Sequence, residues 1–257
     1  MNILAIGDVV TSNGCEFLRN KLSTLKKEKN IDLLIANGEN SADGNGVTPY
    51  SAKYLFTSGI DVITTGNHAF RRKEIYRFLD EQDFIIRPAN YPKSTTPGKG
   101  YCIVDMGYTK VCIINLMGLV YMESLDCPFK KIDFILRQVN DCPIKILDFH
   151  AEATAEKKAL GFYLDGRISA MFGTHTHVQT SDETVLPKGT GYITDVGMTG
   201  TINSVLGVKP ESSIKKMKEK IPIRFEFSKE PCEMDCVLFN IDNISGLTKS
   251  IERLRVI

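Results

Sequence analysis

The four histidines of this chain are the residues whose positions indicate the most about its chemistry. His68, His150, His175 and His177 are the full set, and each follows an apolar, strand-like run by a few residues at most. In an α/β sheet the carboxyl ends of the strands face one crevice, and ligands bind there. We therefore expect the four imidazoles to converge at one end of a sheet.

Acidic and amide side chains follow the early apolar runs in the same way. Asp8, Glu39, Asn40 and Asn67 come just after such runs, within the motifs Gly-Asp, Gly-Glu-Asn and Gly-Asn-His. The glycine at the start of each motif lets the backbone turn tightly and approach a ligand. These motifs should deliver their polar side chains to the same crevice as the histidines.

This mixture of donors predicts metal binding. Imidazole nitrogens with carboxylate and amide oxygens suit first-row metals such as Fe, Mn, Zn and Co. Six or seven ligands are too many for one tetrahedral ion, but they match two ions that share a bridging carboxylate. Two metals about 3.5–4 Å apart clamp the attacking and leaving oxygens of a phosphoryl displacement. The predicted ligands are Asp8, Glu39, Asn67, His150, His175 and His177.

Other interpretations of these residues remain open. A single histidine or a Gly-Asp turn is ordinarily structural, so the metal hypothesis depends on all four histidines standing beside Gly, Asp, Glu or Asn. His-x-His also occurs in metal-dependent amidohydrolases, although there it lies on the first strand and here it comes late. Asp148 and Glu152 flank His150, and either could orient its imidazole. Asp148 could equally do no more than end a strand.

Short apolar runs alternate with helix-like stretches over the first two thirds of the chain. Continuous apolar runs are typical of strands covered on both faces, and they occur at 3–6, 33–36, 62–63, 113–116, 144–149 and 170–172. Apolar residues at helical spacing predict helices over about 14–28, 49–58 and 70–80. The alternation predicts right-handed βαβ units and a largely parallel sheet.

The C-terminal third has a different pattern. Apolar and polar residues alternate over 221–227, which predicts a half-buried strand, and 233–241 and 247–256 resemble a further strand pair. Together these segments predict a second, more antiparallel sheet packed on the first. Because no Pro/Gly/Ser-rich linker or internal repeat interrupts the chain, we expect a single domain over 1–257.

Composition restricts the partners and the compartment. A formal net charge of +1 gives no electrostatic reason to expect a nucleic-acid polymer as a stable partner, although a small nucleotide remains compatible. The seven cysteines are odd in number and form no C-x-x-C pair, as expected of reduced core residues. No window reaches the ~18 apolar residues of a membrane helix. We expect a soluble, cytoplasmic protein with no membrane partner.

The chain resembles the calcineurin-like metallophosphoesterases, and it looks closest to their YmdB-like branch of bacterial cytoplasmic phosphodiesterases. The resemblance runs over essentially the whole chain and rests on the ordered set Gly7-Asp8, Gly38-Glu39-Asn40, Gly66-Asn67-His68, His150 and Gly173-Thr-His-Thr-His177. Supporting motifs include Arg87-Pro-Ala-Asn90 and Asp195-Val-Gly-Met-Thr-Gly200. The resemblance implies an α/β fold in which a two-sheet β-sandwich is flanked by helices.

The same resemblance implies a role for each polar residue. Asp8 would bind metal directly, and Glu39 would bridge both ions. The remaining ligands would be divided between the ions, with one completed by Asn67, His150 and His175 and the other served by His177. His68 would lie beside the phosphate and protonate the leaving oxygen.

Two positions depart from the wider superfamily. Val10 stands where the common pattern has a histidine, and the bridging residue is Glu39 where Asp is usual. Asn40 is the natural replacement for the missing histidine, because it neighbours Glu39 and offers an amide oxygen. Both departures occur in the YmdB-like branch. The expected centre therefore has Asn40 as a seventh ligand, with His68 left free as the acid.

The resemblance implies a phosphodiesterase of cyclic nucleotides, with 2′,3′-cyclic compounds favoured and 3′,5′-cyclic AMP as a second candidate. It also implies two metal ions, with iron favoured over Mn or Zn, and a homo-oligomer. We hypothesise in-line attack by a metal-bridging hydroxide while His68 protonates the departing ribose oxygen. The alternative is a regulatory protein that binds a nucleotide at the metal site with little or no turnover.

Overall fold

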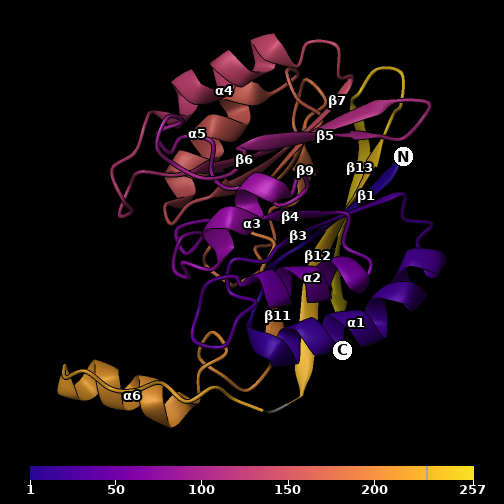
Figure 1. The fold of residues 1–257 in the computed structure, drawn as a ribbon. Helices are drawn as coiled ribbons and strands as arrows, with labels where there is room; N and C mark the ends of the chain where they lie inside the picture. The colour runs from indigo at the N-terminus through magenta and orange to yellow at the C-terminus, as the bar shows by residue number, and fades with distance from the viewer. Residues whose placement is uncertain (230) are drawn as a thin grey trace.

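Two β-sheets lie face to face between layers of helices in the computed structural model, which describes residues 1–229 and 231–257 (Figure 1). The first sheet contains β1 (Asn2–Ile6), β2 (Asp8–Val9), β3 (Leu33–Asn37), β4 (Val62–Thr64), β11 (Met198–Thr201), β12 (Cys232–Ile241) and β13 (Thr248–Val256). Its strand order is β2-β11-β12-β1-β3-β4, and β13 pairs with the free side of β12. The β1, β3 and β4 strands are parallel, whereas β12 runs antiparallel to β1.

The second sheet is formed by the middle of the chain. It contains β5 (Tyr101–Asp105), β6 (Lys110–Met117), β7 (Ile144–His150), β8 (Ala170–Thr174), β9 (Thr184–Val185) and β10 (Gly191–Ile193). The order is β5-β6-β7-β8-β10-β9, with β6, β7, β8 and β10 parallel and the two edge strands antiparallel. The carboxyl ends of the parallel strands therefore meet at one edge, as in other α/β sheets.

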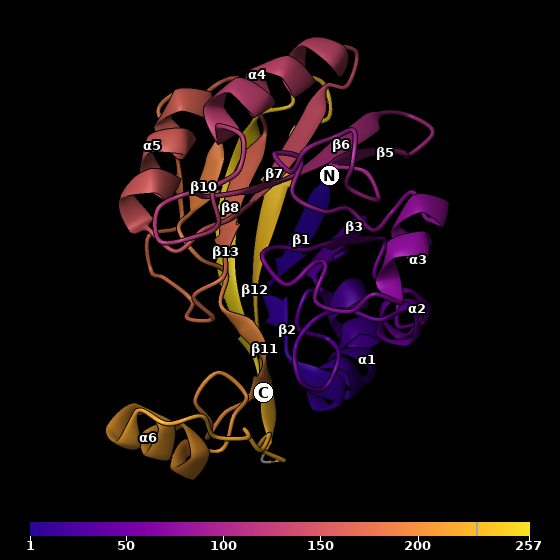
Figure 2. The same cartoon turned by 60° about the vertical axis from the view of Figure 1, so that its left-hand side comes forward.

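Helices cover the outer face of each sheet. Those on the first sheet are α1 (Thr11–Glu28), α2 (Pro49–Thr57) and α3 (Ile75–Glu81), and those on the second are α4 (Pro128–Gln138) and α5 (Thr154–Leu164). A sixth helix, α6 (Pro210–Glu219), projects from the body on an arm (Figure 2). None of the helices in the described ranges is long and apolar enough to cross a membrane.

Burial explains why the strands have no polar face. Leu4 and Leu34 point toward the helices, while Ile35 points toward the other sheet and packs in one cluster with Phe172. Each central strand is therefore covered on both sides, which accounts for its continuous apolar run. The expected architecture, an α/β two-sheet sandwich flanked by helices, is confirmed, and every strand predicted in the first two thirds is present.

The predicted membership of the two sheets was wrong. The C-terminal strands β12 and β13 join the first sheet, where β12 pairs directly with β1, and the second sheet is built from the predicted strands of the middle region. The predicted strand over 221–227 is absent, apart from an isolated bridge between Val208 and Phe227. This segment returns along the arm beside α6, where no neighbouring strand is available to pair with it.

One helix begins later than predicted. The helix expected over 70–80 starts at Ile75, because the residues after His68 form turns in which the Ala69 and Arg71 N–H groups donate to the carbonyls of Gly66 and His68. These turns keep the histidine at the end of β4 rather than on a helix.

Candidate metal centre

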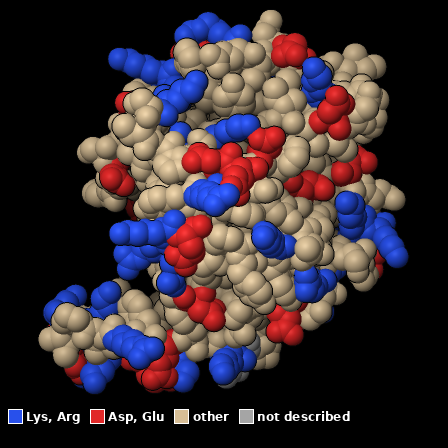
Figure 3. All heavy atoms as spheres, viewed as in Figure 1, with Lys and Arg blue, Asp and Glu red and all other residues tan. Residues whose placement is uncertain are grey.

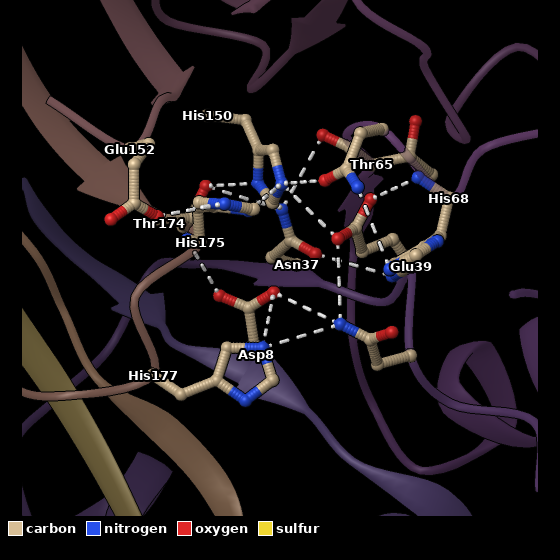
Figure 4. A network of polar contacts seen from close by, with 12 residues as sticks. Asp8, Asn37, Glu39, Thr65, His68, His150, Glu152, Thr174, His175 and His177 are labelled. Carbon is tan, nitrogen blue, oxygen red and sulfur yellow. Dashed lines mark hydrogen bonds and ion pairs between the residues drawn. The ribbon is translucent and has the colours of Figure 1, made fainter. Parts of the chain in front are cut away.

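Polar side chains from both sheets meet where the parallel strands end (Figure 4). The first sheet contributes Asp8 at the start of β2, Glu39 and Asn40 just after β3, and Asn67 with His68 just after β4. The second sheet contributes His150 at the end of β7 and the two histidines that follow β8, His175 and His177. The structure thus brings together every residue that the sequence placed in the site.

Glu39, His150 and His175 form the tightest part of the cluster. One potential ligand atom from each lies within 4.8 Å of the others. The Nε2 atom of His150 is 3.1 Å from Glu39 Oε1 and 3.1 Å from Nδ1 of His175. The same Nε2 lies 2.8 Å from Oδ1 of Asn67. Four donors from four separate elements therefore point at one small volume.

A second group of donors contacts the same oxygen of Glu39, Oε1. The Nδ2 atom of Asn40 is 3.4 Å from Asp8 Oδ1, 3.4 Å from Glu39 Oε1 and 3.3 Å from His177 Nε2. His177 Nε2 is itself 3.5 Å from Asp8 Oδ1. Turning the Asn40 amide over would present its carbonyl oxygen to the same neighbours. Glu39 thus contacts both groups of donors, as a bridging carboxylate would.

Gly66 allows the two sheets to approach each other at the cluster. A Cβ atom at this position would lie 2.2 Å from Cδ2 of His150, so any larger residue would displace the imidazole. The glycines of the early motifs were predicted to let the backbone approach a ligand. At Gly66 the close approach is to a side chain from the opposite sheet.

His68 occupies the rim of the cluster. Its backbone N–H donates to Oε2 of Glu39 at 2.9 Å, and its ring Nε2 lies 3.5 Å from Nδ2 of Asn67. The side chain is partly exposed, unlike the fully buried His150. This position leaves the imidazole accessible to a molecule that enters the site.

Electrostatic interactions between these groups oppose the cost of burying them. Burial alone would raise the pKa of Glu39, but the positive charge of His150, together with His68, lowers it to about 2. Burial lowers the pKa of His150, whereas Glu39 and then Asp8 raise it to about 9. The pKa of His175 falls to about 4 because of burial and the charge on His150. Metal binding would therefore displace a proton from His150, because an imidazole ligand must be neutral.

A buried polar layer lies behind the histidines. The hydroxyl of Thr174 is 2.9 Å from Nδ1 of His150 and donates to Oδ1 of Asp148 at 2.7 Å. Burial raises the pKa of the Asp148 carboxyl to about 7. Glu152 instead lies 3.1 Å from Nε2 of His175. Both flanking acids thus contact the histidine group, but Asp148 reaches His150 through Thr174, and Glu152 contacts a different imidazole.

A buried ion pair supports the loop after β8. The ammonium of Lys157, from α5, lies 2.8 Å from Asp195 Oδ2 and donates to the carbonyl of Thr174 at 2.9 Å. Asp195 Oδ2 also accepts from the backbone N–H of Thr176 at 3.1 Å. Both residues of the pair are fully buried. The pair therefore fixes the backbone on each side of His175.

The loop needs this support because its backbone is strained. His175 has a φ of 104° and His177 a φ of 62°, in the left-handed region that non-glycine residues rarely adopt. Lys157 was not expected in the site, since a lysine on a helix carries no sequence signal of this role. Asp195 begins one of the motifs that carried the family resemblance, and that motif was the available signal for it.

The donor set fits a metal centre. Nε2 of His150 and Nδ1 of His175 lie 3.1 Å apart, so once His150 loses its proton both imidazole lone pairs could be directed at a shared cation. In the described part of the chain, the buried Nδ1 of His177 has no hydrogen-bond partner while Nε2 faces Asp8 and Asn40. Nitrogen donors mixed with carboxylate and amide oxygens are the set that first-row transition metals prefer.

Comparisons with known proteins identify the family to which the chain belongs. The family model described as YmdB-like protein matches residues 4–254. The 2′,3′-cyclic-nucleotide 2′-phosphodiesterase of Bacillus subtilis (strain 168) is 44% identical over 257 residues, covering 100% of this chain and 97% of that protein.

Two solved structures share the whole fold. A novel phosphatase from Mycoplasma pneumoniae superposes with a TM-score of 0.94 at 33% identity, covering 100% of this chain and 93% of that one. A hypothetical protein from Thermus thermophilus gives a TM-score of 0.93 at 38% identity, with 99% and 98% of the two chains covered. The chain therefore belongs to the YmdB-like family, a branch of the calcineurin-like metallophosphoesterases.

Proposed function

We propose that this protein hydrolyses 2′,3′-cyclic nucleotides at a dinuclear metal centre. Membership of the YmdB-like family makes the chain a phosphoric diester hydrolase. The substrate class is supported by the name of the Bacillus subtilis relative. The observation that carries the metal assignment is the convergence of Glu39, His150 and His175 within 4.8 Å of one another.

The arrangement of donors supports the proposed division of the ligands. Asn67, His150 and His175 lie together and would hold one ion, whereas Asp8, Asn40 and His177 lie together and would hold the other. Glu39 contacts both groups and would bridge them. When bound, two such ions neutralise charge on a phosphate and lower the pKa of water toward neutrality. Iron is the metal we favour, with Mn or Zn as alternatives.

His68 is proposed as the general acid. Its backbone is anchored to Glu39, so the imidazole is held beside the bridging carboxylate without itself joining the buried cluster. From the rim it would donate a proton to the departing 2′ oxygen of the ribose. Such proton transfer typically contributes ~10²–10⁴-fold in rate.

The proposal also covers the compartment, the oligomeric state and the size of the substrate. We propose that the enzyme acts in the cytoplasm, because a reducing compartment is where free thiols such as those of Cys15, Cys102, Cys112, Cys127, Cys142 and Cys236 are expected. We further propose that it folds as a single domain, works as a homo-oligomer, and takes small phosphodiesters rather than nucleic-acid polymers. Turnover of 3′,5′-cyclic AMP is a secondary candidate activity.

The role of His68 can be tested by changing the leaving group. The His68→Ala variant should lose ~10²–10⁴-fold in kcat on 2′,3′-cyclic AMP, because the ribose oxygen needs a proton to depart. On bis-nitrophenyl phosphate the loss should be much smaller, since nitrophenolate leaves without protonation. Nucleotide release and nitrophenol absorbance measure the two rates. Equal losses on both substrates, or no loss on the cyclic nucleotide, would show that His68 is not the acid.

The same assay separates catalysis from regulation. If the metal-loaded wild-type protein binds 2′,3′-cyclic AMP tightly but forms no product in a long incubation, the regulatory alternative replaces the enzymatic proposal. A panel of cyclic nucleotides with iron-loaded and manganese-loaded protein would define both substrate and metal.

A further inference from the structure

The Arg87–Asn90 motif has no role in the metal centre, yet its arginine occupies an unusual environment. Arg87 is only 3% exposed. Its guanidinium donates from Nη1 to the carbonyl of Pro88 at 2.9 Å and from Nε to that of Pro97 at 3.3 Å. Across residues 1–229 and 231–257, no carboxylate lies within ion-pair distance of it. A buried charge without an anionic partner is costly, so a counter-ion at this position would be stabilising.

A cavity of about 520 Å³ has Arg87 among its lining residues. It lies between α4 and β5, which are neighbours in the upper half of Figure 1, and the segment before β5 forms one wall. Its volume is within the ~300–1,000 Å³ range of small-molecule sites. Arg87 therefore belongs to the wall of a pocket large enough for a nucleotide-sized molecule.

The charges around this cavity are mostly positive. Four cations line it: Arg87, Lys93, Lys99 and Lys131. Lys99 pairs with Asp83, the one carboxylate in the lining, and Lys131 pairs with Asp126 outside it, so among the described residues Arg87 and Lys93 have no ion-pair partner. The whole chain, in contrast, has a formal net charge of only +1, and Figure 3 shows basic and acidic side chains interspersed over the face that it presents. The excess of cations at this cavity favours an anionic ligand.

Aromatic side chains form the rest of the lining. Phe84 is 42% exposed and Phe134 is 45% exposed, so neither ring is used fully in packing the protein core. Tyr101 also lines the cavity. Exposed aromatic faces beside cations suit a ligand that has both a flat ring and an anionic group.

We propose that this cavity is a second ligand site, separate from the metal centre, that binds a nucleoside monophosphate. The phosphate would lie against Arg87 and the lysines, and the base against the aromatic side chains. The buried guanidinium would then gain the anionic partner that it lacks, and charge-assisted hydrogen bonds to Arg suit phosphate oxygens.

Calorimetric titration of the full-length, metal-free protein with AMP tests this site. The Glu39→Gln variant serves as the background, because it impairs nucleotide binding at the metal centre while leaving the cavity intact. In this background AMP should bind, and adenosine and inorganic phosphate should each bind at least tenfold more weakly, because each has only half of the contacts. No AMP binding in this background, or equal affinity for phosphate alone, would overturn the proposal.

Two variants locate the site and one controls for charge. Lys93→Glu and Phe134→Ala should each weaken AMP binding about tenfold or more, the effect of losing one charged hydrogen bond or one aromatic contact. Lys215→Glu makes the same charge change on α6, on the distant arm, and should leave the affinity unchanged. Both cavity side chains are exposed, so neither change should prevent folding. If Lys93→Glu and Phe134→Ala bind AMP as Lys215→Glu does, the cavity is not the site.

Discussion

The two sheets contribute different kinds of side chain to the centre and support them differently. The first sheet supplies the carboxylate and amide ligands, from residues that closely follow β1, β3 and β4. The second supplies imidazoles, and behind them lies a buried layer of polar residues that includes Thr174, Asp148 and the Lys157–Asp195 pair. The carboxylate and amide ligands therefore come from one side of the interface, whereas the imidazole ligands and their supporting layer come from the other.

The two kinds of ligand differ in which groups orient them. Glu39 accepts from the backbone N–H of His68, and Asp8 accepts from that of His175, so carboxylates are oriented by the main chain around them. An imidazole ligand offers one nitrogen to the metal and needs a partner for the other, which must come from behind. The histidine side should thus be more sensitive to changes outside the cluster than the carboxylate side.

The largest effect is expected at Lys157. Replacing it by methionine leaves Asp195 as an uncompensated buried charge, which typically costs about 3–5 kcal/mol in free energy of unfolding. Urea denaturation of the metal-free protein measures the loss. Lys158→Met, one residue along α5, is the matched control, because the Lys158 ion pair with Asp182 is partly exposed and such pairs are worth ~0–1 kcal/mol. Equal losses in the two variants would remove the special role of the buried pair.

An intermediate effect is expected where the two sheets touch. Gly66→Ala would push a Cβ into the His150 ring and should cost about 1–3 kcal/mol in stability, the usual range for overpacking. It should also weaken metal binding, because His150 must move. At Gly38, just before Glu39, a Cβ would instead contact Cγ2 of Ile63 and Cδ1 of Leu55, neither of which belongs to a proposed metal ligand. We expect Gly38→Ala to keep its metal affinity in competition titrations with a chelator. If both variants lost metal affinity equally, the contact between Gly66 and His150 would not explain the effect.

The smallest effect is expected at Thr174. Thr174→Val removes the hydroxyl between His150 and Asp148, and metal affinity should fall about tenfold, at the lower end of the ~10–100-fold seen for partners of ligands. Thr199→Val is the control, since the buried Thr199 hydroxyl has no hydrogen-bond partner in the described part of the chain. Chelator competition compares the two. If both variants bind metal as wild type does, the layer behind the histidines does not support the site.

The carboxyl-end position of each polar residue could be predicted from sequence, because it depends on local pattern. A buried strand appears as a short apolar run, and the residue that ends it lies at the sheet edge wherever the strand pairs. For this reason Asp8, Glu39 and His150 could be placed together before their strand partners were known. The family resemblance added the acid role of His68, which stays a prediction.

The sheet assignments and the supporting layer could not be predicted in this way. One of the strands that pair with β1 is β12, which lies more than 200 residues away in the chain. The periodicity of a strand carries no information on which strand it pairs with. The alternating pattern at 221–227 lacked such a partner and formed no strand. Lys157 reaches Thr174 only because α5 packs on the second sheet, so its role depends on tertiary structure.

Metal content per chain is the most direct test of the dinuclear centre with Glu39 as its bridge. Elemental analysis of wild-type protein, purified without chelator, should find close to two first-row metal ions per chain, and Glu39→Gln should retain far less because it loses the shared carboxylate. The loss of metal affinity in Glu39→Gln should exceed the ~10–100-fold loss expected when a residue outside the ligand set is changed. Fewer than about one ion in wild type, unchanged in Glu39→Gln, would contradict the dinuclear assignment.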